Sequence, residues 1–107
     1  MALLTAEFAT EQALERLRLA VKTGRSAEVV QWAQVAATAV HEIADVADIP
    51  DPDADTVVRI QNRVTDCLDS MTQADRDGDT EGTLYRGDLV GDAAANFAVF
   101  LKEHTIR

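Results

Sequence analysis

The stretch AEVVQWAQVAATAVHEIADV, residues 27–46, decides the fold class because its apolar residues recur with the period of an α-helix. One apolar stripe recurs at alternating spacings of four and three residues: Val29, Ala33, Ala36, Val40, Ile43 and Ala47. A second stripe covers another side of the same helix: Trp32, Val35, Ala39 and Val46. An apolar arc this wide predicts a central helix that is packed on two sides, or one that leaves a side for a partner chain.

The boundaries of this helix also predict the helix before it. Ser26 can cap its N-terminus, and the helix can run to about Asp48 before a proline stops it. The preceding helix is expected to start near Thr5 or Thr10, since either side chain can cap an N-terminus, and to end at Gly24.

Two further helices are expected in the second half of the chain. The segment IPDPDAD, residues 49–55, is a connector, and a third helix can start at Asp51 or at Asp55. Its buried stripe is Val57, Ile60, Val64, Cys67, Leu68 and Met71. A long acidic loop over residues 72–88 then precedes a last helix capped by Asp88 or Asp92. The sequence therefore predicts an all-α fold of about four helices in one small bundle-like domain, residues 1–107.

Part of the acidic loop, DGDTEGTLYRGD at residues 77–88, has the length and spacing of a calcium-binding loop. Such a loop needs oxygen ligands at positions 1, 3, 5, 7, 9 and 12 and a glycine at position 6. Gly82 falls on position 6, and the candidate ligands that fit best are Asp77, Asp79, Glu81, Thr83 and Asp88. The match resembles the EF-hand and dockerin loops, but the closing Asp88 is short for bidentate binding and Gly87 interrupts the exiting helix. The alternative is a solvated acidic loop without a metal.

Charge and composition restrict the kind of partner. The chain carries a formal charge of −9, and residues 45–92 alone hold thirteen acids against four arginines. Such a surface repels phosphate backbones and anionic lipid, so neither a nucleic-acid nor a membrane partner is expected. The N-terminal segment lacks the features of a signal peptide, and a single cysteine excludes an internal disulfide, which together predict an intracellular protein that is not secreted.

The sequence offers no arrangement of side chains typical of catalysis. Cys67 lies on an apolar stripe, far in sequence from His41 and His104, and the many carboxylates fall where nothing desolvates them. His41 and Asp45 are spaced to form half of a metal site without a second half. We therefore expect a non-enzymatic protein with no cofactor other than calcium, should the loop bind it.

Several segments resemble one family when they are taken in order. These are LLT at 3–5, ATEQALERLRLAV at 9–21, the helix at 27–46, VVRIQNRVTDCLDSM at 57–71 and NFAVFLKEHTIR at 96–107. In length and element order the chain resembles the small helical head-to-tail connector proteins of tailed viruses. The resemblance implies a ring of identical subunits in the virion, between capsid and tail, without catalysis.

Both the double apolar stripe and the resemblance predict a structural protein that binds protein partners, most simply further copies of itself. The residues expected at such contacts are Trp32, Val35, Ala39 and Val46 of the second stripe, together with Arg59 and Arg63, one turn apart on the third helix.

Overall fold

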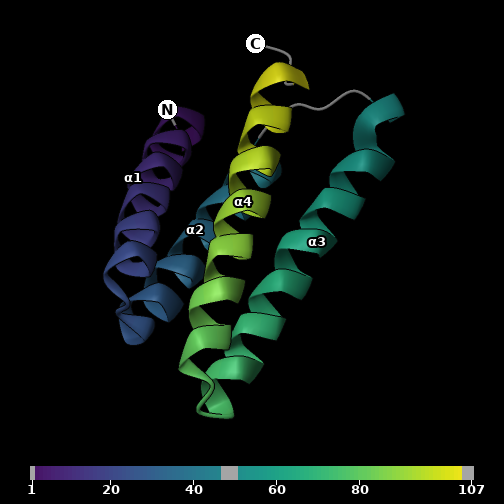
Figure 1. The fold of residues 1–107 in the computed structure, drawn as a ribbon. Helices are drawn as coiled ribbons and strands as arrows, with labels where there is room; N and C mark the ends of the chain where they lie inside the picture. The colour runs from purple at the N-terminus through teal and green to yellow at the C-terminus, as the bar shows by residue number, and fades with distance from the viewer. Residues whose placement is uncertain (1, 47–50, 105–107) are drawn as a thin grey trace.

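The computed structural model describes residues 2–46 and 51–104, with side chains within 7–45 and 55–103. Four helices account for nearly all of this: α1 (Ala2–Thr23), α2 (Ser26–Val46), α3 (Asp51–Arg76) and α4 (Thr80–His104). Figure 1 shows them side by side, each antiparallel to the next in the chain. The prediction of an all-α bundle is confirmed.

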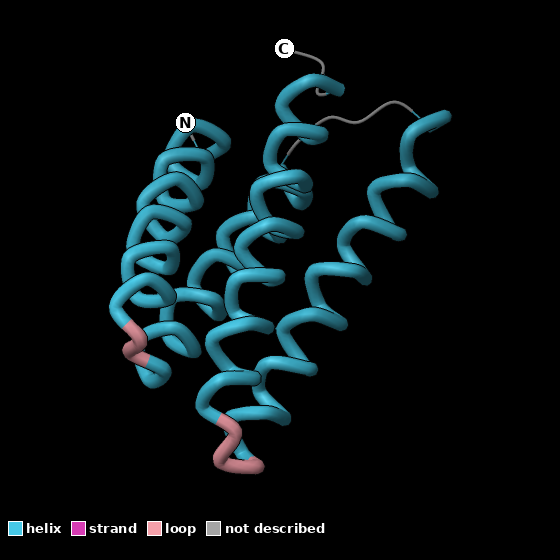
Figure 2. Tube along the Cα trace, in the orientation of Figure 1, coloured by secondary structure: helices cyan, strands magenta, loops and turns pink. Residues whose placement is uncertain are grey.

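Two glycines make the tight turns within the hairpins α1–α2 and α3–α4. Gly24 and Gly78 have φ angles of 72° and 74°, which an L side chain rarely adopts. At each turn the glycine N–H and the next N–H return to carbonyls of the preceding helix: Gly24 to Val21, Arg25 to Ala20, Gly78 to Asp75 and Asp79 to Ala74. This is the Schellman arrangement, and it ends both helices in the same way. Both turns lie at one end of the bundle (Figure 2).

The two hairpins pack on each other mainly through α2 and α4. These helices lie between α1 and α3, which make no contact with each other within the described residues. The Cα atoms extend over 42 × 24 × 15 Å, so the bundle is flattened. Within the described ranges no helix combines the length and the apolar character needed to cross a membrane.

Buried positions of the first hairpin recur in the second. Gly78 lies 54 positions after Gly24, and the same offset relates ten buried positions of α1 and α2 to ten buried positions of α3 and α4. The first set is Thr10, Leu17, Ala20, Val29, Ala33, Ala36, Ala37, Ala39, Val40 and Ile43; the second is Val64, Met71, Ala74, Thr83, Gly87, Val90, Gly91, Ala93, Ala94 and Phe97. The second hairpin thus repeats the pattern of buried positions of the first.

Small residues allow α2 and α4 to approach closely at this contact. Ala33 and Ala37 on α2 and Gly87 and Gly91 on α4 are all buried and spaced one helical turn apart. A Cβ built on Gly87 would overlap the Val29 Cγ1 atom, well within 3.0 Å, so a larger residue there would require Val29 or the helices to shift. The larger core side chains, including Leu17, Ile43, Met71, Phe97 and Leu101, fill the space around this crossing.

The predicted acidic loop at 72–88 is wrong. Helix α3 continues to Arg76, and α4 begins at Thr80, so only Asp77, Gly78 and Asp79 separate them. Asp79 rather than Asp88 or Asp92 caps α4: its Oδ1 accepts the Gly82 N–H at 2.9 Å, and its carbonyl accepts the Thr83 N–H at 2.9 Å.

Two other predicted helix ends need adjustment, at the starts of α1 and α2. Helix α1 begins at Ala2, before Thr5, and Thr10 is buried inside the helix. Ser26 is the first residue of α2, and the Arg25 carbonyl accepts its first hydrogen bond, from Val29 N–H at 2.9 Å. Helix α2 is described to Val46, so its predicted end near Asp48 lies outside the described residues. Of the two predicted starts of α3, Asp51 is confirmed.

Candidate protein-interaction surface

The predicted calcium ligands do not surround a common point. Asp77 and Asp79 lie in the α3–α4 turn, whereas Glu81, Thr83 and Asp88 lie on the first turns of α4. Thr83 is buried and its Oγ1 donates to the Asp79 carbonyl at 2.8 Å. Within the described part of the chain, no three His, Cys, Asp or Glu side chains are grouped so that they could hold a metal ion. The calcium site stays a prediction from sequence without a geometric counterpart here.

Arg18 joins α1 to α4 through two carboxylates. Its Nη1 atom donates to the Asp88 carboxylate and, at 3.1 Å, to the Asp88 carbonyl, and its Nη2 donates to Asp92 Oδ1 at 2.6 Å. Partial burial alone would lower the pKa of Arg18, but the hydrogen bonds and the negative charges of Asp92 and Asp88 outweigh it and raise the pKa. The guanidinium is therefore always charged, and Asp88 is engaged in holding the fold.

The histidine of the predicted half metal site belongs to the packing between helices. His41 Nδ1 lies 2.9 Å from Gln61 Nε2, and its ring meets Phe97 edge to face at 6.3 Å between centroids. Cys67 is half-buried and packs against the core. Both groups thus contribute to packing, and these contacts offer neither of them an acid or a base for activation.

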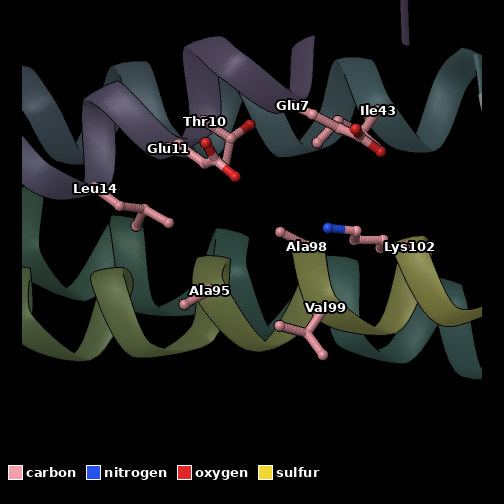
Figure 3. A pocket seen from close by; sticks show the side chains of 9 residues that line it. All are labelled: Glu7, Thr10, Glu11, Leu14, Ile43, Ala95, Ala98, Val99 and Lys102. Atoms are coloured by element: carbon pink, nitrogen blue, oxygen red, sulfur yellow. The ribbon is translucent and has the colours of Figure 1, made fainter. Parts of the chain in front are cut away.

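One cavity, of about 220 Å³, opens between α1 and α4 away from the turns. Figure 3 shows apolar side chains over most of its wall, with Lys102 of α4 across from Glu7 and Glu11 of α1. The wall is formed by Glu7, Thr10, Glu11, Leu14, Ile43, Ala95, Ala98, Val99 and Lys102. The polar part of the wall consists of two carboxylates, one hydroxyl and one ammonium group, from Glu7, Glu11, Thr10 and Lys102.

The outer side of the α1–α2 hairpin exposes large apolar side chains. Phe8 and Leu19 on α1 are 59% and 55% exposed, and Val35 on α2 is 40% exposed. Phe8 and Leu19 are eleven residues apart, three helical turns, and so lie on one line along α1.

Shallow grooves run between the two helices on this side. One groove is lined by Ala9 of α1 and, from α2, by Gln31, Gln34, Val35, Thr38, Ala39 and Glu42. The next is lined by Arg16, Leu19, Ala20, Thr23, Arg25, Glu28, Gln31 and Trp32, and Gln31 borders both. We call this continuous outer side of α1 and α2, from Phe8 to Glu42, the α1–α2 face.

The residues predicted to bind partners are divided by the structure between two surfaces. Trp32, Val35 and Ala39 line the α1–α2 face: Val35 is exposed, Trp32 is half-buried, and Ala39 is buried at the floor of the groove. The Val46 side chain lies outside the described residues. Arg59 and Arg63 are exposed on α3, which belongs to the other hairpin.

Phe8 and Leu19 are not among the predicted contact residues, because they stand out only against the buried side of α1. They lie on the opposite side of α1 from the buried Ala13, Leu17 and Ala20.

The second hairpin provides an internal comparison for this face. At the offset of 54, Phe8 corresponds to Asn62 and Leu19 to Gln73, both exposed on α3. The fold therefore does not require an apolar residue at either position. On α4 some apolar surface remains, since Tyr85 and Leu89 correspond to Gln31 and Val35. The second hairpin exposes large apolar side chains at other positions, namely Val58 on α3 and Tyr85 and Val99 on α4.

Comparison of the chain with protein-family models, with curated proteins and with solved structures finds no match.

Proposed function

We propose that the protein is a non-enzymatic structural subunit that associates with further copies of itself through the α1–α2 face. The observation that carries this proposal is the exposure of Phe8 and Leu19 on one line of α1, at positions where the equivalent helix α3 has Asn62 and Gln73. Covering a phenylalanine or leucine side chain that is otherwise in water is worth about 1.5–3 kcal/mol for full burial.

Charge supports the choice of this hairpin as the contact. Residues 1–46 contain six acids and four bases, a net charge of −2, whereas residues 47–107 contain thirteen acids and six bases, a net charge of −7. Two copies repel each other least when their first hairpins meet and their second hairpins point away from each other.

The virion connector remains a prediction within this class of protein. A ring subunit needs two different surfaces that complement each other, because each copy contacts its neighbours head to tail. The α1–α2 face would supply one surface, and exposed Arg59 and Arg63 on α3 are the predicted candidates for the other. The number of copies in the assembly would separate a ring from a simple pair.

The proposal is tested by transferring the polar residues of α3 onto α1. Sedimentation velocity over a range of protein concentrations would compare the natural chain with Phe8→Asn/Leu19→Gln, in high monovalent salt that screens the net charge. We expect the natural chain to associate and the double variant to sediment as a folded monomer.

A matched control changes an exposed apolar residue elsewhere. Val58 on α3 is 53% exposed, and Val58→Asn should leave association unchanged. A natural chain that stays monomeric at every concentration, or a double variant that associates as well as the natural chain, would refute the proposal.

A further inference from the structure

The charges of the α1–α2 hairpin are separated along its length. Its turn end carries Lys22 and Arg25, while Arg18 is paired with Asp88 and Asp92 of α4. Its open end carries Glu42 and Asp45 on α2, and Glu7 and Glu11 of the same end line the α1–α4 cavity across from Lys102. Glu28 is the single acid near the turn, where it pairs with Arg25 at 3.5 Å. Lys22 in the last turn of α1 also suits the helix dipole. The hairpin is thus basic at one end and acidic at the other.

Two copies can meet through the α1–α2 face in two symmetric ways. If both hairpins point in the same direction, turn end lies on turn end, and like charges face each other at both ends. If one copy is reversed, the basic turn end of each copy lies on the acidic open end of the other, so opposite charges meet at both ends of the pair. Because opposite charges attract and like charges repel at distances of a few ångströms, both pairs of ends favour the reversed arrangement.

We infer that the protein forms a two-fold symmetric pair in which the α1–α2 faces meet end over end, with α1 antiparallel to α1 of the partner copy. This inference rests on the proposed self-association and specifies its geometry.

The apolar residues favour the same arrangement as the charges. Phe8 lies toward the open end of α1 and Leu19 toward the turn end, about 16 Å apart along the helix. Reversing one copy brings Phe8 of each chain toward Leu19 of the other. The same arrangement therefore gives both apolar contacts and attraction between opposite charges. A symmetric pair of this kind closes at two copies, with both acidic α3–α4 hairpins on its outside.

The test reverses the charge pattern without changing the net charge. A variant with Lys22→Glu, Arg25→Glu, Glu42→Lys and Asp45→Lys changes four exposed side chains and makes the turn end acidic and the open end less acidic. Natural and variant chains, distinguished by mass, are mixed at about 0.1 M salt, where charges about 10 Å apart still interact, and the dimers are counted by native mass spectrometry.

End-over-end pairing predicts that mixed dimers are depleted below their random share, because the acidic turn end of the variant then meets the acidic open end of the natural chain. Mixed dimers enriched above the random share would show pairing in the same direction and overturn this inference, while the proposed self-association would stand. Closed assemblies of more than two copies would overturn it in the same way. A natural chain that stays monomeric would refute both the end-over-end geometry and the proposed self-association.

A distance measurement covers the case in which the charge-reversed variant fails to fold. In a Cys67→Ser background, a spin label at Thr23→Cys marks the turn end of each copy. End-over-end pairing separates the two labels by roughly the length of α1, about 30 Å, whereas pairing in the same direction brings them together. A short distance between the labels would contradict the inference.

Discussion

Val29 of α2 lies directly against Gly87 of α4, so closely that a Cβ on residue 87 would overlap the Val29 Cγ1 atom. Real Cβ atoms do not come this close to a carbon, and therefore either the helices would have to move apart or Val29 would have to change its rotamer. The contact fixes the spacing of the two hairpins, and with it the position of every group on the α1–α2 face.

Gly87→Ala should destabilise the protein. In an uncrowded helix this change stabilises by up to about 1 kcal/mol through helix propensity, whereas overpacking at a tight contact costs about 1–3 kcal/mol. We expect the clash to outweigh the propensity, with a net loss of about 1–2 kcal/mol in the free energy of unfolding, measured by denaturant titration.

A second substitution, Val29→Ala, separates the steric clash from the other effects of Gly87→Ala. In a Val29→Ala background the methyl group added at position 87 has room, so Gly87→Ala should there be neutral or stabilising. Equal losses in both backgrounds would show that the close approach of α2 and α4 is not what requires glycine.

Asp79→Ala should cost about 1 kcal/mol of stability because it removes the side-chain acceptor that caps α4 at the Gly82 N–H. Asp77→Ala is the matched control: Asp77 is also exposed in the same turn, and its carboxylate accepts a surface hydrogen bond from Gln73, at 3.0 Å. We expect Asp77→Ala to change stability by less than about 0.5 kcal/mol. If thermal unfolding shows equal effects for the two variants, Asp79 does not act as the cap.

Calcium should produce no saturable heat in a calorimetric titration in high monovalent salt. The carboxylate of Asp79 is held by the start of α4 and that of Asp88 by Arg18, so a single ion could collect them only by unwinding the first turns of α4. High salt suppresses the diffuse attraction of cations to an acidic protein. Binding of about one ion per chain that is lost in Asp77→Ala would instead restore the calcium-loop interpretation.

The sequence predicts the helices better than it predicts the acidic segment between α3 and α4. Regular apolar spacing indicates four helices, Gly24 indicates the end of the first, and Asp51 is one of the two predicted starts of the third. The structure contains all of these. Residues 72–88 resemble a loop because they are rich in aspartate and glycine, yet of their glycines Gly78 alone has a positive φ. Gly82 and Gly87 are helical, and Gly87 is present because of Val29.

Glycine therefore has two structural roles within ten residues: Gly78 adopts the positive φ of the turn, and Gly87 allows α4 to pack closely on α2. Composition alone does not distinguish these roles. Spacing helps: Gly87 and Gly91 are one turn apart, as are Ala33 and Ala37, and small residues at this spacing are typical of closely packed helices.

Only the part of the contact surface that lies on α2 is predictable from the sequence. Trp32 and Val35 lie on a helix whose wide apolar arc is visible in the sequence. Phe8 and Leu19 lie on the more polar α1, and they become visible as a surface pair only once the buried side of that helix is known.

The two Schellman turns have a consequence for the order in which the chain folds. Each hairpin closes through two or three residues, so its helices meet at a small cost in loop entropy and can form early. Val29 and Gly87 are separated by 58 positions, and their contact must await the docking of one finished hairpin on the other. We expect this docking to be the slow step, which would leave the α1–α2 hairpin formed, with its apolar face in solvent, before the core between α2 and α4 is complete.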